Sequence, residues 1–281
     1  MLARAMPGIL PKLTEDEALE VTKIYSITGN LHPDEAIVTT RPFRSPHHTT
    51  SRIGLIGGGS NPAPGEVSLS HRGVLFLDEF PEFPRSVLES LRQPMEDGFV
   101  TISRARATVS YPAQFILVAA SNPCPCGYYG DDKKQCSCLP GQISRYQKRV
   151  SGPILDRVDM HISVPTVDPE KLIGASGKGE KSTVIQKRVQ KARDTQGKRY
   201  VGTSFKSNSD LSSRAIKKHC KLSENCLTLL RSAVAKMSLS ARAYHKVIKV
   251  ARTISDLSGE KEISTSHIAE ALQYRPKEGN I

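Results

Sequence analysis

The 281-residue sequence contains no tryptophan, and aromatic residues make up only 5% of it. Modules that read nucleic-acid bases use aromatic side chains for stacking, so the composition gives no support to base readout. No apolar run approaches the roughly 20 residues that a membrane-spanning helix needs. Residues 1–12 have neither a long apolar stretch nor a cleavage-site pattern, which argues against secretion. We therefore expect a cytoplasmic protein without a membrane partner.

Charge is distributed unevenly along the chain. Residues 1–170 contain 17 Lys and Arg against 19 Asp and Glu, whereas residues 171–281 contain 23 against 9, a net charge of +14. The chain is long enough for two compact units, and this asymmetry favours two domains. The basic second domain is typical of a surface that faces an acidic partner such as nucleic acid. A solvated basic surface without a partner is the alternative.

Apolar patterns predict the same division. Unbroken apolar runs at residues 73–77 and 115–120 predict strands buried on both faces, as in a parallel sheet covered by helices. A shorter run predicts a third strand at residues 160–164. The remaining expected elements of the front half are a helix at 15–26 capped by Thr14, loops and hairpins over 39–70, a helix at 84–95 and a hairpin at 99–111.

From residue 183 onward the periodicity is helical. The expected helices span 183–196, 209–218, 223–237, 241–258 and 265–274. The sequence therefore predicts an α/β domain over residues 1–168 and an all-α domain over residues 169–281.

Two acids, Asp78 and Glu79, follow the first apolar strand directly. An aspartate at the carboxyl end of such a strand can hold Mg²⁺ or its water shell beside nucleotide phosphates. The adjacent glutamate can orient and deprotonate an attacking water. The carboxyl ends of strands are also where open α/β sheets bind ligands. Many strands end in acids, however, so the pair alone is a weak motif and its interpretation depends on its neighbours.

Three further residues follow in the order that an ATP-hydrolysing site needs. Asn122 comes at the end of the second apolar strand, where its amide can position the lytic water as a sensor 1 residue. Arg157 precedes the third expected strand and can reach the nucleotide of a neighbouring subunit, as an arginine finger does. Arg242 opens a helix of the second domain and can contact phosphate as a sensor 2 residue. Each arginine taken singly can instead form a surface salt bridge, but the four elements in this order favour an ATPase.

Longer stretches of the sequence resemble a known family. The stretches that carry the resemblance are Arg41–His48, Pro64–His71, Gly73–Phe80, Leu91–Glu96, Ser121–Gly127, Ser151–Arg157 and Leu239–His245. They are similar to the magnesium-chelatase-like AAA+ ATPases of the ComM/YifB type, over roughly residues 1–275.

The resemblance implies a P-loop NTPase fold with a parallel sheet and a helical lid, and ATP and Mg²⁺ as ligands. It implies a homo-oligomeric, hexameric ring of ATPase subunits, linked in the ComM relatives to natural transformation and branch migration of DNA. Asp78 would serve Mg²⁺, Glu79 the lytic water, and Asn122, Arg157 and Arg242 the roles given above. No feature of the sequence selects a porphyrin, although the family name refers to magnesium insertion.

One segment of the family pattern is missing from the sequence. The family has a glycine-rich loop ending in Gly-Lys-Ser/Thr before its first helix, and neither Gly177-Lys178-Gly179 nor Gly197-Lys198-Arg199 replaces it. That loop supplies a cradle of backbone N–H groups, a lysine and a hydroxyl ligand for Mg²⁺. We therefore expect very weak nucleotide binding, and a sheet that lacks a central strand and is incomplete at its N-terminal side. The chain is then a truncated part of a working ATPase, or a non-hydrolysing remnant or interaction protein.

Four of the six cysteines, Cys124, Cys126, Cys136 and Cys138, lie within 15 residues. In a reducing compartment four such thiols fit tetrahedral Zn²⁺ better than two disulfides. The one-residue gaps are tighter than the usual two, so free thiols or redox-labile pairs remain the alternative. A zinc ion here would hold the loop after Asn122 in place and would not catalyse.

Two other groups of side chains suggest function. Arg104 and Arg106 lie near the tip of the expected hairpin and resemble the pore loops of ring helicases, which contact the phosphate backbone of DNA. Such contacts are independent of base sequence and sensitive to salt, and a solvated turn is the alternative. His47 and His48 invite a metal site, but no acid or cysteine is near them in sequence. We expect them to pack within their loop or beside DNA.

Overall fold

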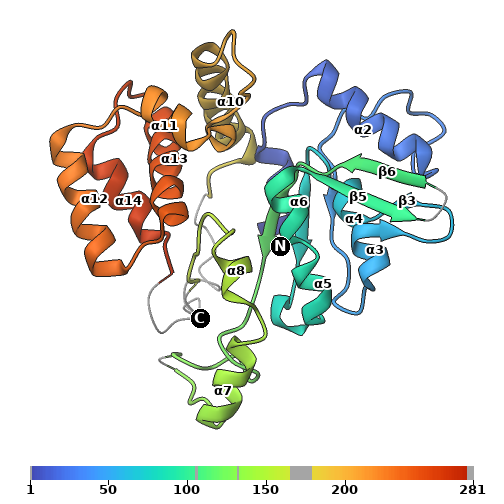
Figure 1. Ribbon diagram of the computed structural model, residues 1–281, viewed down its shortest axis with the longest axis horizontal. Coiled ribbons are helices and arrows are strands. Elements are labelled where there is room, and N and C mark those ends of the chain that lie inside the picture. Colours follow the sequence, from blue (N-terminus) through green and yellow to red (C-terminus); the bar gives the residue numbers. More distant parts are fainter. Residues whose placement is uncertain (1, 105–106, 132, 165–178, 277–281) are drawn as a thin grey trace. The chain divides into compact units, whose positions relative to one another are not determined.

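The computed structural model describes residues 2–104, 107–131, 133–164 and 179–276. The chain divides into two compact units, residues 1–157 and 158–281 (Figure 1). The first contains a parallel sheet with helices and the second is helical, which confirms the predicted fold class. The expected domain boundary at residue 168 lies outside the described residues.

A three-stranded parallel sheet organises the first unit. Its order is β1 (Phe43–Arg44), β4 (Val74–Leu77) and β7 (Ile116–Ala119). Val74, Leu75 and Leu77 of the central strand are buried, as an unbroken apolar run predicts. The residues of β7 are half-buried or exposed, with Ile116 41% exposed. Burial on both faces was therefore the wrong prediction for β7, because among the described strands it pairs on one side only.

The third expected strand, at residues 160–164, does not form in the part of the chain that the structure describes. Ile162 and Val164 are 69% and 75% exposed. The backbone N–H of His161 donates to the carbonyl of Tyr274, near the chain's last described helix. An apolar run becomes a strand only when a neighbouring strand accepts and donates backbone hydrogen bonds, and this one has no such neighbour among the described residues.

The segment 39–70 was expected to form loops and hairpins. It also forms a strand of the parallel sheet, two short helices and part of the core. It supplies β1, the helices α3 (Arg52–Ile56) and α4 (Glu66–Leu69), and a small hairpin of β2 (Gly57–Gly58) with β3 (Ala63–Pro64). Leu55 and Val67 are completely buried and belong to the core of the first unit. The hairpin was predicted correctly, whereas the strand and the core positions were missed.

Two other expected elements of the first unit form, one of them in two pieces. The helix α2 (Glu15–Ile27) begins with a capping box of Thr14 and Glu17, as predicted. The helix expected at 84–95 is divided into α5 (Arg85–Glu89) and α6 (Arg92–Asp97). Pro94 has no N–H to donate to the carbonyl of residue 90, so it fits the first turn of a new helix better than the interior of a long one.

The remaining elements of the first unit surround this core. The predicted antiparallel hairpin forms from β5 (Phe99–Arg104) and β6 (Ala107–Pro112). Short helices complete the unit: α1 (Leu2–Ala5), η1 (Met6–Ile9), η2 (Phe80–Glu82), α7 (Pro140–Gln147) and α8 (Gly152–Leu155). Its core packs Leu75 and Leu77 of β4 against Leu88, Leu91 and Val100.

The second unit consists of the helices drawn in gold to red in Figure 1. They are α10 (Ser182–Arg199), α11 (Ser213–His219), α12 (Glu224–Met237), α13 (Ala241–Ser258) and α14 (Thr265–Gln273), with the short η3 (Asn208–Asp210). Serine side chains cap α11, α12 and α13 by accepting a backbone N–H. Among the residues described, no helix combines the length and apolar character that a membrane span requires.

Candidate functional site

The acid pair lies at the carboxyl end of β4, where the strand turns sharply into η2. Glu79 adopts a left-handed backbone conformation, with φ 50° and ψ 45°. Its N–H donates to Oδ1 of Asp78 at 3.0 Å, and the N–H of Phe80 donates to the carbonyl of Ala120 at 2.8 Å. A non-glycine residue in this region is strained, and such strain persists where surrounding bonds enforce it. The turn leaves both carboxylates exposed at the edge of the sheet.

His48 contacts the acid pair, although it was not a predicted site residue. Its Nδ1 lies 2.9 Å from Oε2 of Glu79, and its ring meets the Phe83 ring edge-on, with centroids 6.4 Å apart. The sequence shows no acid near the histidines, but the loop after β1 and the turn after β4 emerge at the same edge because the two strands run parallel. The expectation of simple packing or a DNA contact therefore missed this partner.

Asn122 lies at the same edge of the sheet as the acid pair. Leu77 pairs with Ala119 in the parallel register, and the N–H of Ala120 donates to the carbonyl of Leu77 at 2.9 Å. Asp78 and Asn122 thus follow the last paired residues of neighbouring strands, and both side chains are exposed. An amide and two carboxylates at this edge supply oxygen ligands of the kind that Mg²⁺ accepts.

The two arginines predicted to contact phosphate differ in their exposure to solvent. Arg157 is only 10% exposed in its side chain, and its Nη2 lies 2.9 Å from Oε1 of Glu96 in α6. Its Nη1 also donates to the carbonyl of Pro153 at 2.6 Å. Arg242 is exposed at the second position of α13, after the capping residue Ser240. The structure thus holds Arg157 within its own unit and leaves Arg242 at a helix N-terminus of the other unit.

The predicted DNA-contacting arginines lie partly outside the described residues. The backbone of Arg104 ends β5 and pairs with Ala107. The side chain of Arg104 and the whole of Arg106 are outside the described part of the chain. The predicted role of both arginines in contacting DNA stays a prediction.

The four clustered cysteines come together in space. The Sγ atoms of Cys124, Cys126 and Cys136 are 3.4 to 3.7 Å apart, and with Cys138 all four lie within 4.8 Å of one another. These separations are too long for a disulfide bond and are close to the roughly 3.8 Å between thiolates around tetrahedral zinc, which binds sulfur at about 2.3 Å. A hydrogen bond from the backbone of Tyr128 lowers the pKa of the Cys126 thiol to about 5, which favours the thiolate that a metal needs. Backbone hydrogen bonds also favour the thiolates of Cys136 and Cys138, but desolvation and hydrogen bonds with neighbouring thiols outweigh them and raise both pKa values, that of Cys136 to about 12. The donor set therefore fits zinc.

Comparison with known proteins shows to which family the sequence is similar. Residues 1–172 match the family described as magnesium chelatase, subunit ChlI, and residues 179–275 match its C-terminal companion. Competence protein ComM of Haemophilus influenzae is 46% identical over 98% of this chain and 53% of its own length. The uncharacterized protein YifB of Salmonella typhimurium is 44% identical, again over 98% of this chain and 53% of its own length.

A more distant relative carries the family's name. The chloroplastic magnesium-chelatase subunit ChlI of Chlamydomonas reinhardtii is 28% identical over 39% of this chain. The chain spans about half the length of the ComM and YifB relatives that it matches. With both family matches in chain order and this identity over nearly its whole length, the chain belongs to the magnesium-chelatase-like AAA+ proteins of the ComM/YifB family.

Proposed function

We propose that this chain provides the hydrolytic edge and the lid of an AAA+ ATPase that works on DNA as a homo-oligomeric, hexameric ring in the cytoplasm. The observation that carries the proposal is the placement of Asp78 and Glu79 at the carboxyl end of β4, beside the end of β7 that carries Asn122. Membership of the magnesium-chelatase-like AAA+ family supports ATP as substrate and Mg²⁺ as its companion ion.

Each side chain at this edge has a chemical task in the proposed reaction. Asp78 offers carboxylate oxygens to Mg²⁺ or its water shell, and the bound ion would neutralise charge on the phosphates. Glu79 accepts the proton of the attacking water. His48 holds the Glu79 carboxylate through their 2.9 Å contact, and Asn122 orients the water from the neighbouring strand. The left-handed turn at Glu79 fixes where its carboxylate leaves the sheet.

The two arginines complete the proposal by contacting phosphate from outside this edge. Arg242 belongs to the helical unit and would act as the lid contact. Arg157 would act on the nucleotide of the neighbouring subunit, and its pairing with Glu96 means that it must exchange one carboxylate partner for the phosphate. Assembly into the ring thus requires Arg157 to open an ion pair that the isolated chain keeps closed.

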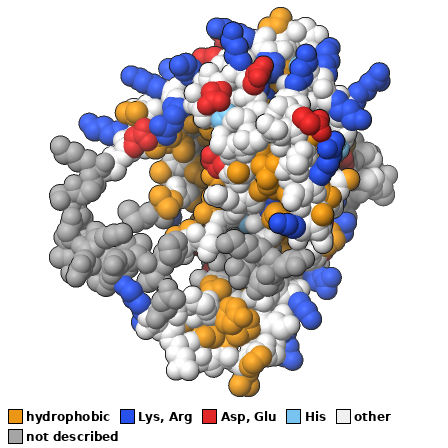
Figure 2. All heavy atoms as spheres, turned by 90° about the vertical axis from the view of Figure 1, so that its left-hand side faces the viewer, with side chains coloured by type: hydrophobic (Ala, Val, Ile, Leu, Met, Phe, Trp, Pro, Cys, Tyr) orange, Lys and Arg blue, Asp and Glu red, His pale blue; other side chains and the backbone are white. Residues whose placement is uncertain are grey.

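The DNA part of the proposal depends on charge. The segment 171–281 carries 23 basic against 9 acidic residues. Figure 2 shows Lys and Arg side chains spread over the face it draws, with fewer acidic side chains between them. With the Arg104 and Arg106 hairpin, such a surface supports salt-sensitive contacts to phosphates without base readout.

Mutation of Glu79 tests the ATPase proposal. In the intact enzyme, Glu79→Gln should preserve ATP binding and lower turnover by about 10²- to 10⁴-fold, because the amide cannot accept the proton. Glu35→Gln, which neutralises an exposed acid away from the site, should leave both unchanged. Unchanged turnover in Glu79→Gln would remove this residue from its assigned role.

A second candidate, a non-hydrolysing remnant or interaction protein, is favoured by one observation. The sequence contains no Gly-Lys-Ser/Thr loop to cradle the phosphates. Calorimetric titration of the 281-residue chain with ATP should therefore show very weak binding, and micromolar affinity would contradict this expectation. An in-frame phosphate loop in the DNA that precedes the codon of Met1 would support the working ATPase, and a stop or frameshift there would support the remnant.

We also propose that Cys124, Cys126, Cys136 and Cys138 bind one structural zinc ion, which fits their distances. Metal analysis of the purified chain should find about one zinc per chain. Cys138→Ser should lose most of it, whereas Cys220→Ser removes a buried thiol outside the cluster and should keep it. Equal zinc content in the two variants, or almost none in the unmutated chain, would reject the site and favour free thiols.

A further inference from the structure

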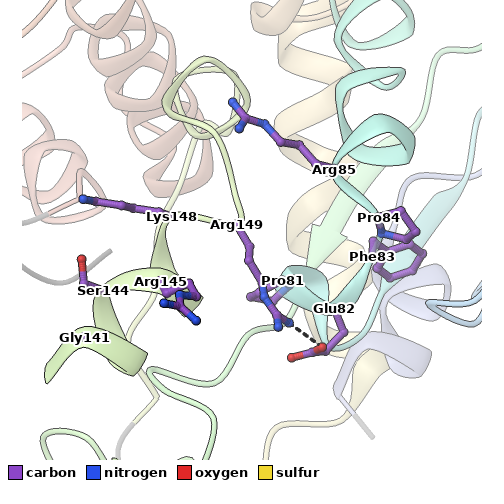
Figure 3. A pocket seen from close by; sticks show the side chains of 10 residues that line it. All are labelled: Pro81, Glu82, Phe83, Pro84, Arg85, Gly141, Ser144, Arg145, Lys148 and Arg149. Carbon is purple, nitrogen blue, oxygen red and sulfur yellow. Dashed lines mark hydrogen bonds and ion pairs between the residues drawn. The ribbon is translucent and has the colours of Figure 1, made fainter. Parts of the chain in front are cut away.

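A pocket of about 820 Å³ lies in the first unit between α7 and the segment that runs from η2 into α5. Four cations line it, Arg85 on one wall and Arg145, Lys148 and Arg149 on the other, and the single acid is Glu82. Figure 3 shows Arg145, from α7, and Arg149, from the segment that follows α7, reaching toward the wall of η2, whereas Lys148 points away from it. The lining therefore carries a net charge of +3.

One ion pair crosses the pocket and neutralises one of these cations. Nη1 of Arg149 lies 2.6 Å from Oε2 of Glu82, which links the two walls. In the part of the chain that the structure describes, no carboxylate lies within 4 Å of the cationic groups of Arg85, Arg145 or Lys148. Three exposed cations around one concave surface repel one another and create a positive potential, which an anionic ligand would relieve.

The side chains that line the pocket favour contacts to phosphate groups without stacking on bases. Its aromatic residue, Phe83, is only 3% exposed, and neighbouring Tyr146 is 5% exposed, so neither offers a face on which a base can stack. Guanidinium groups match phosphate oxygens with paired N–H donors. We propose that this pocket binds the phosphodiester backbone of nucleic acid, and a single-stranded oligonucleotide serves as the probe. The inference rests on the proposed action on DNA and is independent of ATP hydrolysis.

Both walls of the pocket are continuous with the candidate site. The segment η2 begins directly after Glu79, and α7 begins two residues after Cys138. The other end of α7 is tied to the loop after Asn122, because Nε2 of Gln147 donates to the carbonyl of Pro123 at 3.3 Å. A backbone bound here contacts the segment that follows the proposed base and the helix that the cysteine cluster anchors.

The test is anisotropy of a labelled single-stranded oligothymidylate, titrated with the 281-residue chain in the absence of nucleotide over a range of salt. Arg85→Gln/Arg145→Gln should weaken binding about tenfold and lower the slope of log K against log salt by about 1.4, since each lost phosphate contact removes about 0.7. Lys23→Gln/Arg52→Gln removes two exposed cations of the same unit outside the pocket and should change neither.

A second variant is expected to bind more tightly, which is a result that misfolding would not produce. Glu82→Gln releases Arg149 from its ion pair, so binding should tighten several-fold and the salt slope should rise by about 0.7. Equal effects of the pocket and control variants, or no binding by the unmutated chain, would overturn the proposal. If inorganic triphosphate binding falls in Arg85→Gln/Arg145→Gln while DNA binding does not, the pocket takes nucleotide phosphates and the backbone assignment is wrong. A failed Glu79→Gln test leaves these outcomes unaffected, because no ATP is present.

Discussion

A buried acid of the helical unit and the exposed acid pair of the α/β unit are in opposite environments. In the helical unit the side chain of Asp256 is completely buried, and it is paired with Arg199 and with Arg252 at 3.0 Å. In the α/β unit Asp78 and Glu79 are exposed at the edge of the sheet. Buried and satisfied polar groups fix a structure, whereas exposed acids at a strand end remain available to a ligand. Asp256 is therefore expected to stabilise the fold, whereas Asp78 and Glu79 are the acids to which we assign the proposed chemistry.

The carboxylate of Asp256 is satisfied by several direct hydrogen bonds. Asn208 donates to Oδ2 of Asp256 at 2.9 Å, and Arg199 donates to the same oxygen at 2.8 Å. Although burial opposes ionisation, these hydrogen bonds and the two guanidinium groups hold the pKa of Asp256 below its usual value. The helical unit therefore carries its charged network as part of its core.

The largest expected effect comes from breaking this cluster. Asp256→Ala leaves two guanidinium groups, of which Arg252 is 3% exposed, without their carboxylate, and we expect a loss of about 3–5 kcal/mol in the free energy of unfolding. Asp78→Ala should change it by less than about 0.5 kcal/mol, because that side chain is exposed. Urea unfolding followed by circular dichroism measures both, and comparable losses would break the contrast between the units.

In the α/β unit, a glycine lies where the start of β4 approaches the backbone just before β1. Gly73 precedes β4, and a Cβ added there would lie 2.1 Å from the carbonyl oxygen of Pro42. Gly73→Ala must push β1 away from β4, and we expect a loss of about 3 kcal/mol, at the upper end for overpacking. At Gly152, in α8, nothing lies within 4 Å of an added Cβ, so Gly152→Ala is the matched control. Urea unfolding followed by circular dichroism measures the stability of both variants. Equal free energies of unfolding would show that β1 can move away from β4 without loss of stability.

The sequence predicts elements best where one local signal is strong. The apolar run of β4 and the helical periodicity of α12 and α13 predict elements that form close to where they were expected. The strand β1 has two residues, too few for any periodicity, and only its pairing with β4 makes it a strand. The run at 160–164 is the opposite case, since it has the composition of a strand and lacks a neighbour among the described residues.

The candidate site follows the same logic. Asp78 and Asn122 were predicted to share an edge because the carboxyl ends of parallel strands meet there. The contact of His48 with Glu79 could not be predicted, since it requires knowing that β1 lies beside β4. The cation pocket was missed for a related reason, because Arg85 and Arg145 are far apart in the sequence and only the packing of α7 brings them together.

The smallest expected effect concerns the one buried histidine that connects elements of the α/β unit. The side chain of His71 is 2% exposed, and its Nδ1 accepts the N–H of Gln114 at 3.0 Å. The proton of the neutral ring is then on Nε2, which donates to Oε2 of Glu20 at 3.1 Å. Burial lowers the pKa of His71 below its usual value, so the folded state resists the proton that the unfolded chain takes up.

Stability should therefore fall as the pH is lowered through about 6.5, where the unfolded histidine becomes protonated. Burial tends to raise the pKa of Glu20, but hydrogen bonds from Arg72 and His71 outweigh it and lower that pKa to about 2. Its contribution is present above about pH 4.5 and is lost below it, so Glu20 adds little to the pH dependence between pH 7 and 5. Burial also lowers the pKa values of His219 and His245, so the contribution of His71 is the difference in slope between the variant and the unmutated chain. His71→Gln should flatten the dependence of the unfolding midpoint on pH in that window, whereas His32→Gln, at a side chain 68% exposed, should not. An unchanged slope in His71→Gln would mean that protonation of this buried histidine does not affect the stability of the α/β unit.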